Sequence, residues 1–227
     1  MALHPLSSGN LADQVADALR DAILEGRYPP GTRLVERTIA AELGVSHIPV
    51  REALSRLADE GLTERTPRRG SRVATLSARE LDELSTLRTV LEQFVVARVG
   101  ERLTPRTERE LRRIVEAMRR AAADGNFRRV FDLDQRFHER LWELADHRML
   151  NELVTQLRSR IGAFLRAATA ALPPESLEQH AASHDVLLDA LLDDDPEAGR
   201  AEMARHIEAA ATRIRASLPE PEGDADD

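Results

Sequence analysis

Cysteine is absent from this 227-residue sequence, which excludes disulfide scaffolds, cysteine-ligated zinc and thiol nucleophiles. Lysine is absent as well, so all 32 basic residues are arginine. No stretch approaches the roughly 18 consecutive apolar residues that a membrane span needs, and the opening run MALHPLSSGNLADQV lacks the basic region and apolar core of a secretory signal. Hydrophobic residues make up 42% of the chain, enough for one large or two modest cores. We therefore expect a cytoplasmic protein without a membrane partner.

The formal net charge of -8 is unevenly distributed along the chain. Residues 1–76 hold ten arginines and ten acidic residues, whereas residues 77–227 hold 22 arginines and 30 acidic residues. Within the first part, residues 65–72 (RTPRRGSR) contain four arginines and no acid. Because local rather than total charge decides where a phosphate backbone can dock, this part remains a candidate for nucleic-acid binding.

The first third of the chain shows the pattern of a winged helix-turn-helix. Apolar spacing and glycine or proline breaks predict helices at residues 11–25, 37–43 and 47–59. Ser46 is the predicted N-cap of the third helix. Strand-like segments at residues 62–66 and 71–75 flank the tight turn Pro67-Arg68-Arg69-Gly70. Two helices joined by a short glycine-containing turn and followed by a hairpin are typical of this motif.

From residue 77 onward the pattern is wholly helical. Six helices are predicted, at residues 78–101, 105–123, 127–145, 147–170, 175–193 and 196–216. They favour an antiparallel bundle, and the acidic residues 219–227 are predicted to form a disordered tail. The predicted fold is therefore mainly α, with a winged helix-turn-helix domain at residues 1–76 and an all-α domain at residues 77–218.

In a winged helix-turn-helix the third helix lies in the DNA major groove, with its N-terminal residues facing the base edges. The candidate DNA-contacting residues are Ser46, His47, Ile48 and Arg51 on this helix, Arg37 at the start of the preceding one, and Arg68 and Arg69 in the wing. Arginine can bind guanine bidentately, and Ile48 can contact a thymine methyl. Any single arginine here could lie on a solvated face, but the ordered combination favours DNA binding.

Four polar residues on three predicted helices share faces with apolar residues. Asp134 and His138 are four residues apart on one helix, while His184 and His206 lie on two others. An unpaired buried carboxylate is costly, so Asp134 needs a partner. One carboxylate and three imidazoles suit a divalent transition metal, and such a site keeps about one positive charge that would attract an anion. The spacing equally allows an Asp–His hydrogen bond with two unrelated core histidines.

The motifs of the first part closely resemble the GntR family of regulators. The resemblance rests on PGTRL at residues 30–34, LGVS at 43–46, PVREAL at 49–54 and EGL at 60–62, and it covers nearly all of residues 11–76. It implies operator binding by a dimer, with DNA contacts at Arg37, Ser46, Arg51 and Gly70. The family usually has arginine at the position of His47, where it often reads a guanine.

Residues 80–216 resemble the FCD ligand-binding domain of the FadR subfamily, and six helices rather than seven resemble its VanR-like branch. The motifs are Leu87-Arg88 with Leu91-Glu92, Asp134 with Phe137-His138, His184 with Leu191, and Met203 with His206. In metal-binding members the positions of Asp134, His138, His184 and His206 hold the ion, here expected to be zinc or nickel. Small organic acids are common effectors there. Arg88 is expected to pair with the effector, unless it only pairs with Glu92.

The leading interpretation is a dimeric transcription regulator and not an enzyme. We expect a repressor that binds a palindromic operator and responds to a small organic acid held near a divalent metal. One alternative is a metal-dependent, hydrolase-like enzyme, because an aspartate and three histidines could activate water. However, the sequence offers no convincing general base near them and the winged helix would be unexplained. The other alternative is a helical interaction protein without a small ligand.

Overall fold

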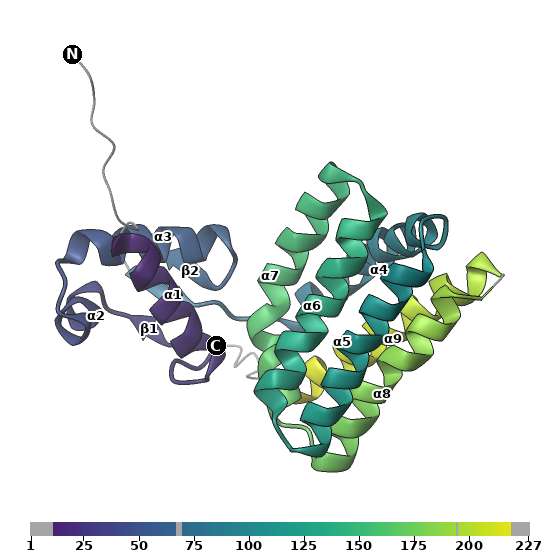
Figure 1. Cartoon of the computed structure of the whole chain (residues 1–227). Helices are drawn as coiled ribbons and strands as arrows, with labels where there is room; N and C mark the ends of the chain where they lie inside the picture. The colour runs from purple at the N-terminus through teal and green to yellow at the C-terminus, as the bar shows by residue number, and fades with distance from the viewer. Residues whose placement is uncertain (1–10, 67–69, 194, 219–227) are drawn as a thin grey trace, which may run out of the picture. The chain divides into compact units, whose positions relative to one another are not determined.

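The computed structural model describes residues 11–66, 70–193 and 195–218 (Figure 1). The chain divides into two compact units, the first made of residues 1–75 with 159–163 and the second of residues 76–158 with 164–227. Among the described residues, strands occur only in the first unit. The predicted fold class, mainly α with a small N-terminal wing, is confirmed. The predicted turn residues 67–69 and the predicted tail at 219–227 lie outside the described residues.

The first unit combines three helices with a three-stranded antiparallel sheet of order β1-β3-β2. Its elements are α1 (Leu11–Leu24), β1 (Arg33–Leu34), α2 (Glu36–Leu43), α3 (His47–Asp59), β2 (Thr63–Thr66) and β3 (Gly70–Val73). The register pairs Arg33 with Arg72 and Thr66 with Gly70. The five predicted elements are confirmed to within two residues at each end. Within the described residues, β1 is the element that the pattern does not predict, because two residues are too few to show alternation.

The turn between α2 and α3 sets the exposed face of α3. Gly44 has a φ of 66°, a left-handed conformation that glycine adopts without steric cost, and it ends α2. On the inner side of α3, Val50, Ala53 and Leu57 are fully buried in the core of the unit. The first turn of α3 is therefore left with its outer side chains free of the core.

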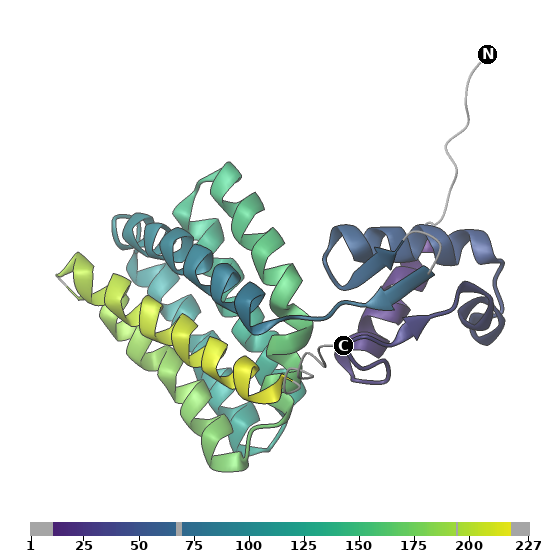
Figure 2. The same ribbon diagram turned by 180° about the vertical axis from the view of Figure 1, so that it is seen from behind.

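The second unit is a bundle whose described helices run back and forth along a common direction (Figure 2). They are α4 (Ala78–Gly100), α5 (Pro105–Ala123), α6 (Phe127–Ala145), α7 (Arg148–Ala170), α8 (Pro174–Leu191) and α9 (Pro196–Ser217). All six predicted helices are confirmed to within two residues at each end. No helix of the described part of the chain is long and apolar enough to cross a membrane.

The starts of these helices follow from local chemistry. Ser77 and Glu80 form a reciprocal capping box at the start of α4. Pro105, Pro174 and Pro196 each occupy the first helical position, where the missing N–H costs little. These signals are local in sequence, so the boundaries are predictable.

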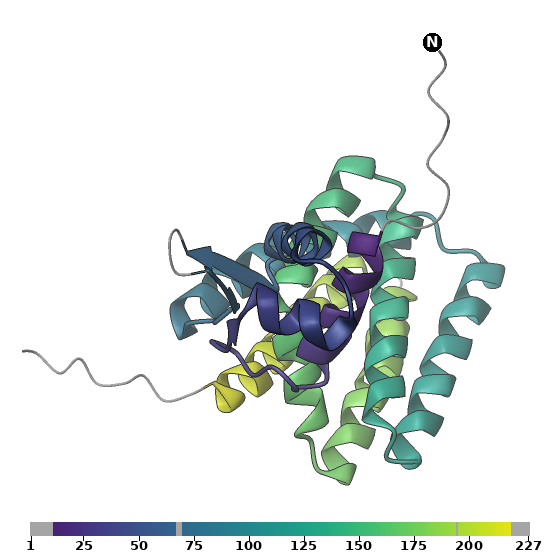
Figure 3. The same ribbon diagram turned by 90° about the vertical axis from the view of Figure 1, so that its left-hand side faces the viewer.

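The apolar faces of the helices meet in one continuous core. In α5 and α6, which lie side by side (Figures 1 and 3), Leu111 and Val115 are buried with Phe137 and Leu141. Helices α8 and α9 add residues such as Leu187 to the same core. The polar residues considered next lie on these inward-facing helix sides.

Candidate DNA-binding and metal-binding sites

The predicted base-reading residues lie at the exposed start of α3. Ser46 is the N-cap residue in extended conformation, as predicted, but its side chain makes no capping hydrogen bond. The expectation of a hydroxyl cap is therefore wrong, although the helix does begin directly after Ser46. His47 is exposed, and Ile48 is 58% exposed although it is apolar. The hydroxyl, the imidazole and the isoleucine side chain are thus all available to a partner.

Arg51 is held by a carboxylate from the neighbouring helix. Its Nε donates to Glu36 Oε2 at 3.1 Å, and its Nη2 lies 3.1 Å from the same oxygen. Glu36 begins α2, and Arg37 is exposed beside it. The ion pair brings the start of α2 next to the exposed side of α3. The sequence pattern does not predict it, because Glu36 and Arg51 are 15 residues apart on different helices.

The wing is only partly described. Gly70, at the start of β3, is exposed and has a φ of 86°, a conformation that favours glycine. Arg65 and Arg72 are exposed on the paired strands β2 and β3. Arg68 and Arg69, the predicted wing-tip contacts, lie outside the described residues.

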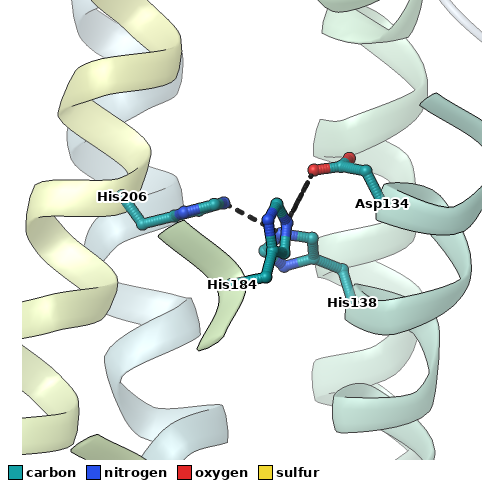
Figure 4. A group of neighbouring side chains, drawn as sticks. All are labelled: Asp134, His138, His184 and His206. Carbon is teal, nitrogen blue, oxygen red and sulfur yellow. Dashed lines mark hydrogen bonds and ion pairs between the residues drawn. The ribbon is translucent and has the colours of Figure 1, made fainter. Parts of the chain in front are cut away.

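In the second unit, four polar side chains converge from three helices (Figure 4). Asp134 and His138 come from α6, His184 from α8 and His206 from α9. All four are buried, and one ligand atom of each lies within 4.8 Å of the others. The structure therefore brings together all four residues that the sequence predicts as metal ligands.

The spacing of the donor atoms fits a single ion. His184 Nε2 is 3.0 Å from Asp134 Oδ1, and His138 Nε2 is 3.3 Å from His206 Nε2. Two donors that bind one tetrahedral zinc ion at about 2.0–2.1 Å lie about 3.4 Å apart. A carboxylate with three imidazoles is also a donor set that zinc and nickel accept. Metal binding itself stays a prediction.

Electrostatics keep Asp134, His138 and His206 in the protonation state that a metal needs. Burial lowers the pKa of both His138 and His206, and for His138 the positive charge of Arg158 lowers it further. Burial alone would raise the pKa of Asp134, but the charge of Arg158 and the hydrogen bond with His184 hold it well below its ordinary value. At neutral pH, His138 and His206 are therefore neutral beside a carboxylate.

Asp134 uses its two oxygens differently. Arg158 of α7 donates to Oδ2 and also bonds Gln135, whereas His184 and His180 face Oδ1, His180 at 3.6 Å. Oδ1 can therefore bind an ion while Oδ2 keeps its arginine. Arg158 is only 4% exposed. The sequence pattern does not predict this pairing, because nothing local relates residue 158 to residue 134.

Arg88 forms an ion pair with Glu92, four residues later on the same helix. This is the alternative role that the sequence allowed for Arg88. Its Nη2 donates to Glu92 Oε1 at 2.8 Å, and both side chains are buried. Glu92 also accepts a 3.3 Å hydrogen bond from Trp142 Nε1, and its Oε2 lies 3.3 Å from His138 Nδ1. Burial alone would raise the pKa of Glu92, but the charge of Arg88 and the contact with His138 lower it. Glu92 thus joins Arg88 to the four-residue cluster.

A small cavity adjoins the cluster. It is about 10 Å³ in volume, and its lining includes Arg88, Arg158, Arg213, His180 and His206. Such a volume holds about one water molecule. Burial lowers the pKa of His180 to about 3. The contact of Arg88 with an effector stays a prediction, but its side chain does border this space.

Comparison with known proteins supplies the family context. The model for bacterial regulatory proteins of the gntR family matches residues 11–73, and the FCD domain model matches residues 83–209. The Escherichia coli K12 transcriptional regulator McbR is 31% identical over 191 residues, which span 84% of this chain and 86% of McbR. A probable D-xylose utilization operon transcriptional repressor of Paenarthrobacter nicotinovorans is 33% identical over 205 residues, spanning 90% of this chain and 88% of the repressor.

Solved structures agree with these relatives. The structure of E. coli McbR/YncC has a TM-score of 0.77 and 29% identity, covering 93% of this chain and 99% of that one. The structure of a protein from Rhodococcus sp. RHA1, named a putative transcriptional regulator GntR, has a TM-score of 0.74 and 25% identity, covering 92% of this chain and 99% of that one. The similarity thus extends over both units.

Proposed function

Because the chain belongs to the GntR family of DNA-binding transcription regulators and carries an FCD domain, we propose that a small organic acid, bound near a divalent metal in its helical unit, controls operator binding by its N-terminal unit. The family resemblance predicted from the sequence is confirmed, and the enzyme alternative is wrong, since the family and these relatives regulate transcription. The buried cluster of Asp134, His138, His184 and His206 is the observation that carries the proposal.

On the DNA side, the proposal assigns base reading to the exposed start of α3. Ser46, His47, Ile48 and Arg51 face the major groove, and Arg37 contacts the backbone. Gly70 allows the wing backbone to approach DNA closely, and Arg68 and Arg69 are proposed to contact phosphate or the minor groove. The exposure of Ile48 and the free hydroxyl of Ser46 support this assignment, because neither side chain has a role within the fold.

On the effector side, the metal would supply positive charge that attracts an organic anion to the adjoining cavity. Arg88 lines this cavity and belongs to α4. Four residues of the chain join α4 to strand β3 of the N-terminal unit. A ligand that binds one arrangement of α4 better than another would shift the population of DNA-competent molecules. Several relatives are named as repressors, which supports repression as the mode of action here.

We expect one bound ion per chain, and its loss in His184→Ala. The variant removes an imidazole that is fully buried in the cluster. Adding zinc or nickel to the metal-free wild type at about 100 times the dissociation constant should raise the free energy of unfolding by about 2.7 kcal/mol. An organic acid should then change operator affinity only in the metal-loaded wild type. Elemental analysis of untagged protein, thermal denaturation and fluorescence anisotropy with a selected operator measure these effects.

The matched control is His147→Asn. His147 lies in the same unit outside the cluster, and its Nδ1 caps α7 by accepting from Leu150 N–H, a role that asparagine can fill. This variant should keep the metal and the stabilisation that the metal gives. Metal content in His184→Ala equal to that of wild type would overturn the proposed site. An unchanged melting temperature with every organic acid tried would favour a protein without a small ligand.

A dimer is the second part of the proposal, and an exposed apolar surface supports it. Leu87, Val90 and Phe94 follow one side of α4 and are 49%, 65% and 48% exposed. Met149 and Leu153 of α7 are 62% and 47% exposed. The Phe94 ring contacts that of His147 at 5.9 Å, just before α7, which links the two helices. We call these five residues the α4–α7 surface; a second copy covering it would set two winged helices at a fixed spacing.

Val90→Glu should convert the dimer to a monomer. A carboxylate at the centre of the α4–α7 surface would have to be buried without a partner, which costs several kcal/mol. Analytical ultracentrifugation should show half the mass, and affinity for a two-half-site operator should fall at least tenfold, while a single half-site is bound as before. Val186→Glu is the control, because Val186 is 54% exposed on α8. Dissociation in both variants, or in neither, would contradict this interface.

A further inference from the structure

Arg213 differs in its pairing from the other arginines that line the small cavity beside the cluster. It lies on α9, partly buried, and lines the same cavity as His206. Burial lowers its pKa, an effect that the negative charge of Asp134 opposes. Within the described residues, it has neither a hydrogen-bond partner nor a carboxylate within ion-pair distance. A partly buried guanidinium that has no protein partner is available to bind an anionic ligand.

The two other cavity arginines are already neutralised. Arg88 pairs with Glu92, and Arg158 pairs with Asp134. These two pairs contribute no net charge. Arg213 therefore leaves one unmatched positive charge in the cavity, and a divalent ion at the cluster would raise the unmatched charge to about three. A ligand with two negative charges balances this cavity better than a ligand with one.

The backbone of Arg213 lies about two helical turns beyond the cluster residue His206. Arg213 follows His206 by seven residues, a rise of about 10 Å along α9. Since side chains on a helix lean toward its N-terminus, that of Arg213 leans back toward His206. The cavity thus has one anion-binding end at the cluster and a second at Arg213.

His180 adds a hydrogen-bonding group to the same cavity. It is 6% exposed, and its Nδ1 has no hydrogen-bond partner among the described residues. A buried ring nitrogen without a partner is uncommon, and here it borders the space into which a ligand would fit. Among the described residues, the Arg213 guanidinium and His180 Nδ1 therefore both border this cavity without a hydrogen-bond partner.

We infer that the effector is a small dicarboxylate, with one carboxylate beside the four-residue cluster and the other on Arg213, and with a hydrogen bond from His180. This inference rests on the proposed function and names its ligand class. At about 10 Å³ the cavity is too small for such a molecule, so the helices that line it must move apart to admit it. Binding therefore changes the packing of the bundle, which is what an effector needs to do.

The experiment compares acids of equal carbon number on the zinc-loaded full-length protein. Succinate and glutarate are titrated against butyrate and valerate by calorimetry, with wild type, Arg213→Gln and Arg213→Lys. We expect the better dicarboxylate to bind wild type at least tenfold more tightly than its monocarboxylate counterpart. Arg213→Gln should reduce dicarboxylate affinity about 10- to 100-fold, as for other charge-assisted hydrogen bonds, and leave monocarboxylate affinity unchanged. Arg213→Lys should fall between the two.

Two controls make the outcome decisive. Arg205→Gln removes an arginine that is 67% exposed on the same helix and should behave as wild type. Zinc content reports whether Arg213→Gln keeps the cluster intact. Equal affinity for mono- and dicarboxylates, or equal loss of both in Arg213→Gln, would overturn this inference and leave the proposed function standing. Failure of all four acids to bind or to alter operator affinity would overturn both.

Discussion

Asp134→Asn is expected to lower the free energy of unfolding of the metal-free protein by about 3–5 kcal/mol. The substitution removes the carboxylate that faces Arg158 while Arg158, 4% exposed, stays inside the bundle. Breaking a buried pair by deleting one partner leaves an uncompensated charge, which costs far more than the intact pair contributes. Chemical denaturation in the presence of a chelator measures the effect without a contribution from bound metal.

Two further variants separate this cause from a general loss of packing. Asp132→Asn changes an aspartate of the same helix that is 55% exposed and 3.9 Å from Arg166, and should cost less than about 1 kcal/mol. Asp134→Asn combined with Arg158→Gln should cost less than the sum of the two single changes, because the double variant holds no unpaired charge. Strict additivity would contradict a direct pairing of Asp134 with Arg158.

Arg51→Ala should weaken operator binding by about 1–3 kcal/mol, or about 5- to 150-fold, if Arg51 reads a base. The effect should be confined to the selected operator and should relax its sequence preference at one position per half-site. Binding sequences are first selected from a random duplex pool with wild-type protein. Anisotropy titrations at fixed salt then compare the selected duplex with a scrambled one. An equal loss on both would instead assign Arg51 to a phosphate.

The control for this change is Glu36→Gln. This variant removes the ion pair between Glu36 and Arg51 but keeps the guanidinium. If Arg51→Ala acts through lost DNA contacts, Glu36→Gln should retain operator binding at least as strong as that of wild type. A similar loss in both variants would mean that the ion pair matters for the shape of the helix-turn-helix rather than for DNA contact.

Most of the fold is predictable because its signals are local. Prolines at the first position of three helices, the Ser77–Glu80 capping box and the left-handed Gly44 each determine a boundary within a few residues. The helical spacing of apolar residues predicts which side of each helix faces the core. Strand β1 cannot be predicted from local signals, because its two residues are identified as a strand only by their pairing with β3, about 40 residues later in the chain.

The candidate site is predictable in its four donors but not in what surrounds them. Asp134, His138, His184 and His206 are recognisable because each is polar on an otherwise apolar helix face. Arg158 and Arg213 carry no such signal, since arginine recurs along both α7 and α9. Their roles depend on which helices become neighbours, and that is decided by packing across the whole bundle.

The ion pair between Arg51 and Glu36 bears on how much more tightly a regulator binds its operator than random DNA. A protein bound to random duplex can keep the ion pair between Arg51 and Glu36 and bind through contacts of other residues with the phosphates. If Arg51 reads a base as proposed, it must leave Glu36 to reach into the groove, and a base with two well-placed acceptors would compensate for that exchange. At a mismatched site Arg51 would stay on Glu36 at no cost, whereas at the operator the lost ion pair would be subtracted from the base contact. The carboxylate of Glu36 would therefore limit how much more tightly the operator is bound than random duplex.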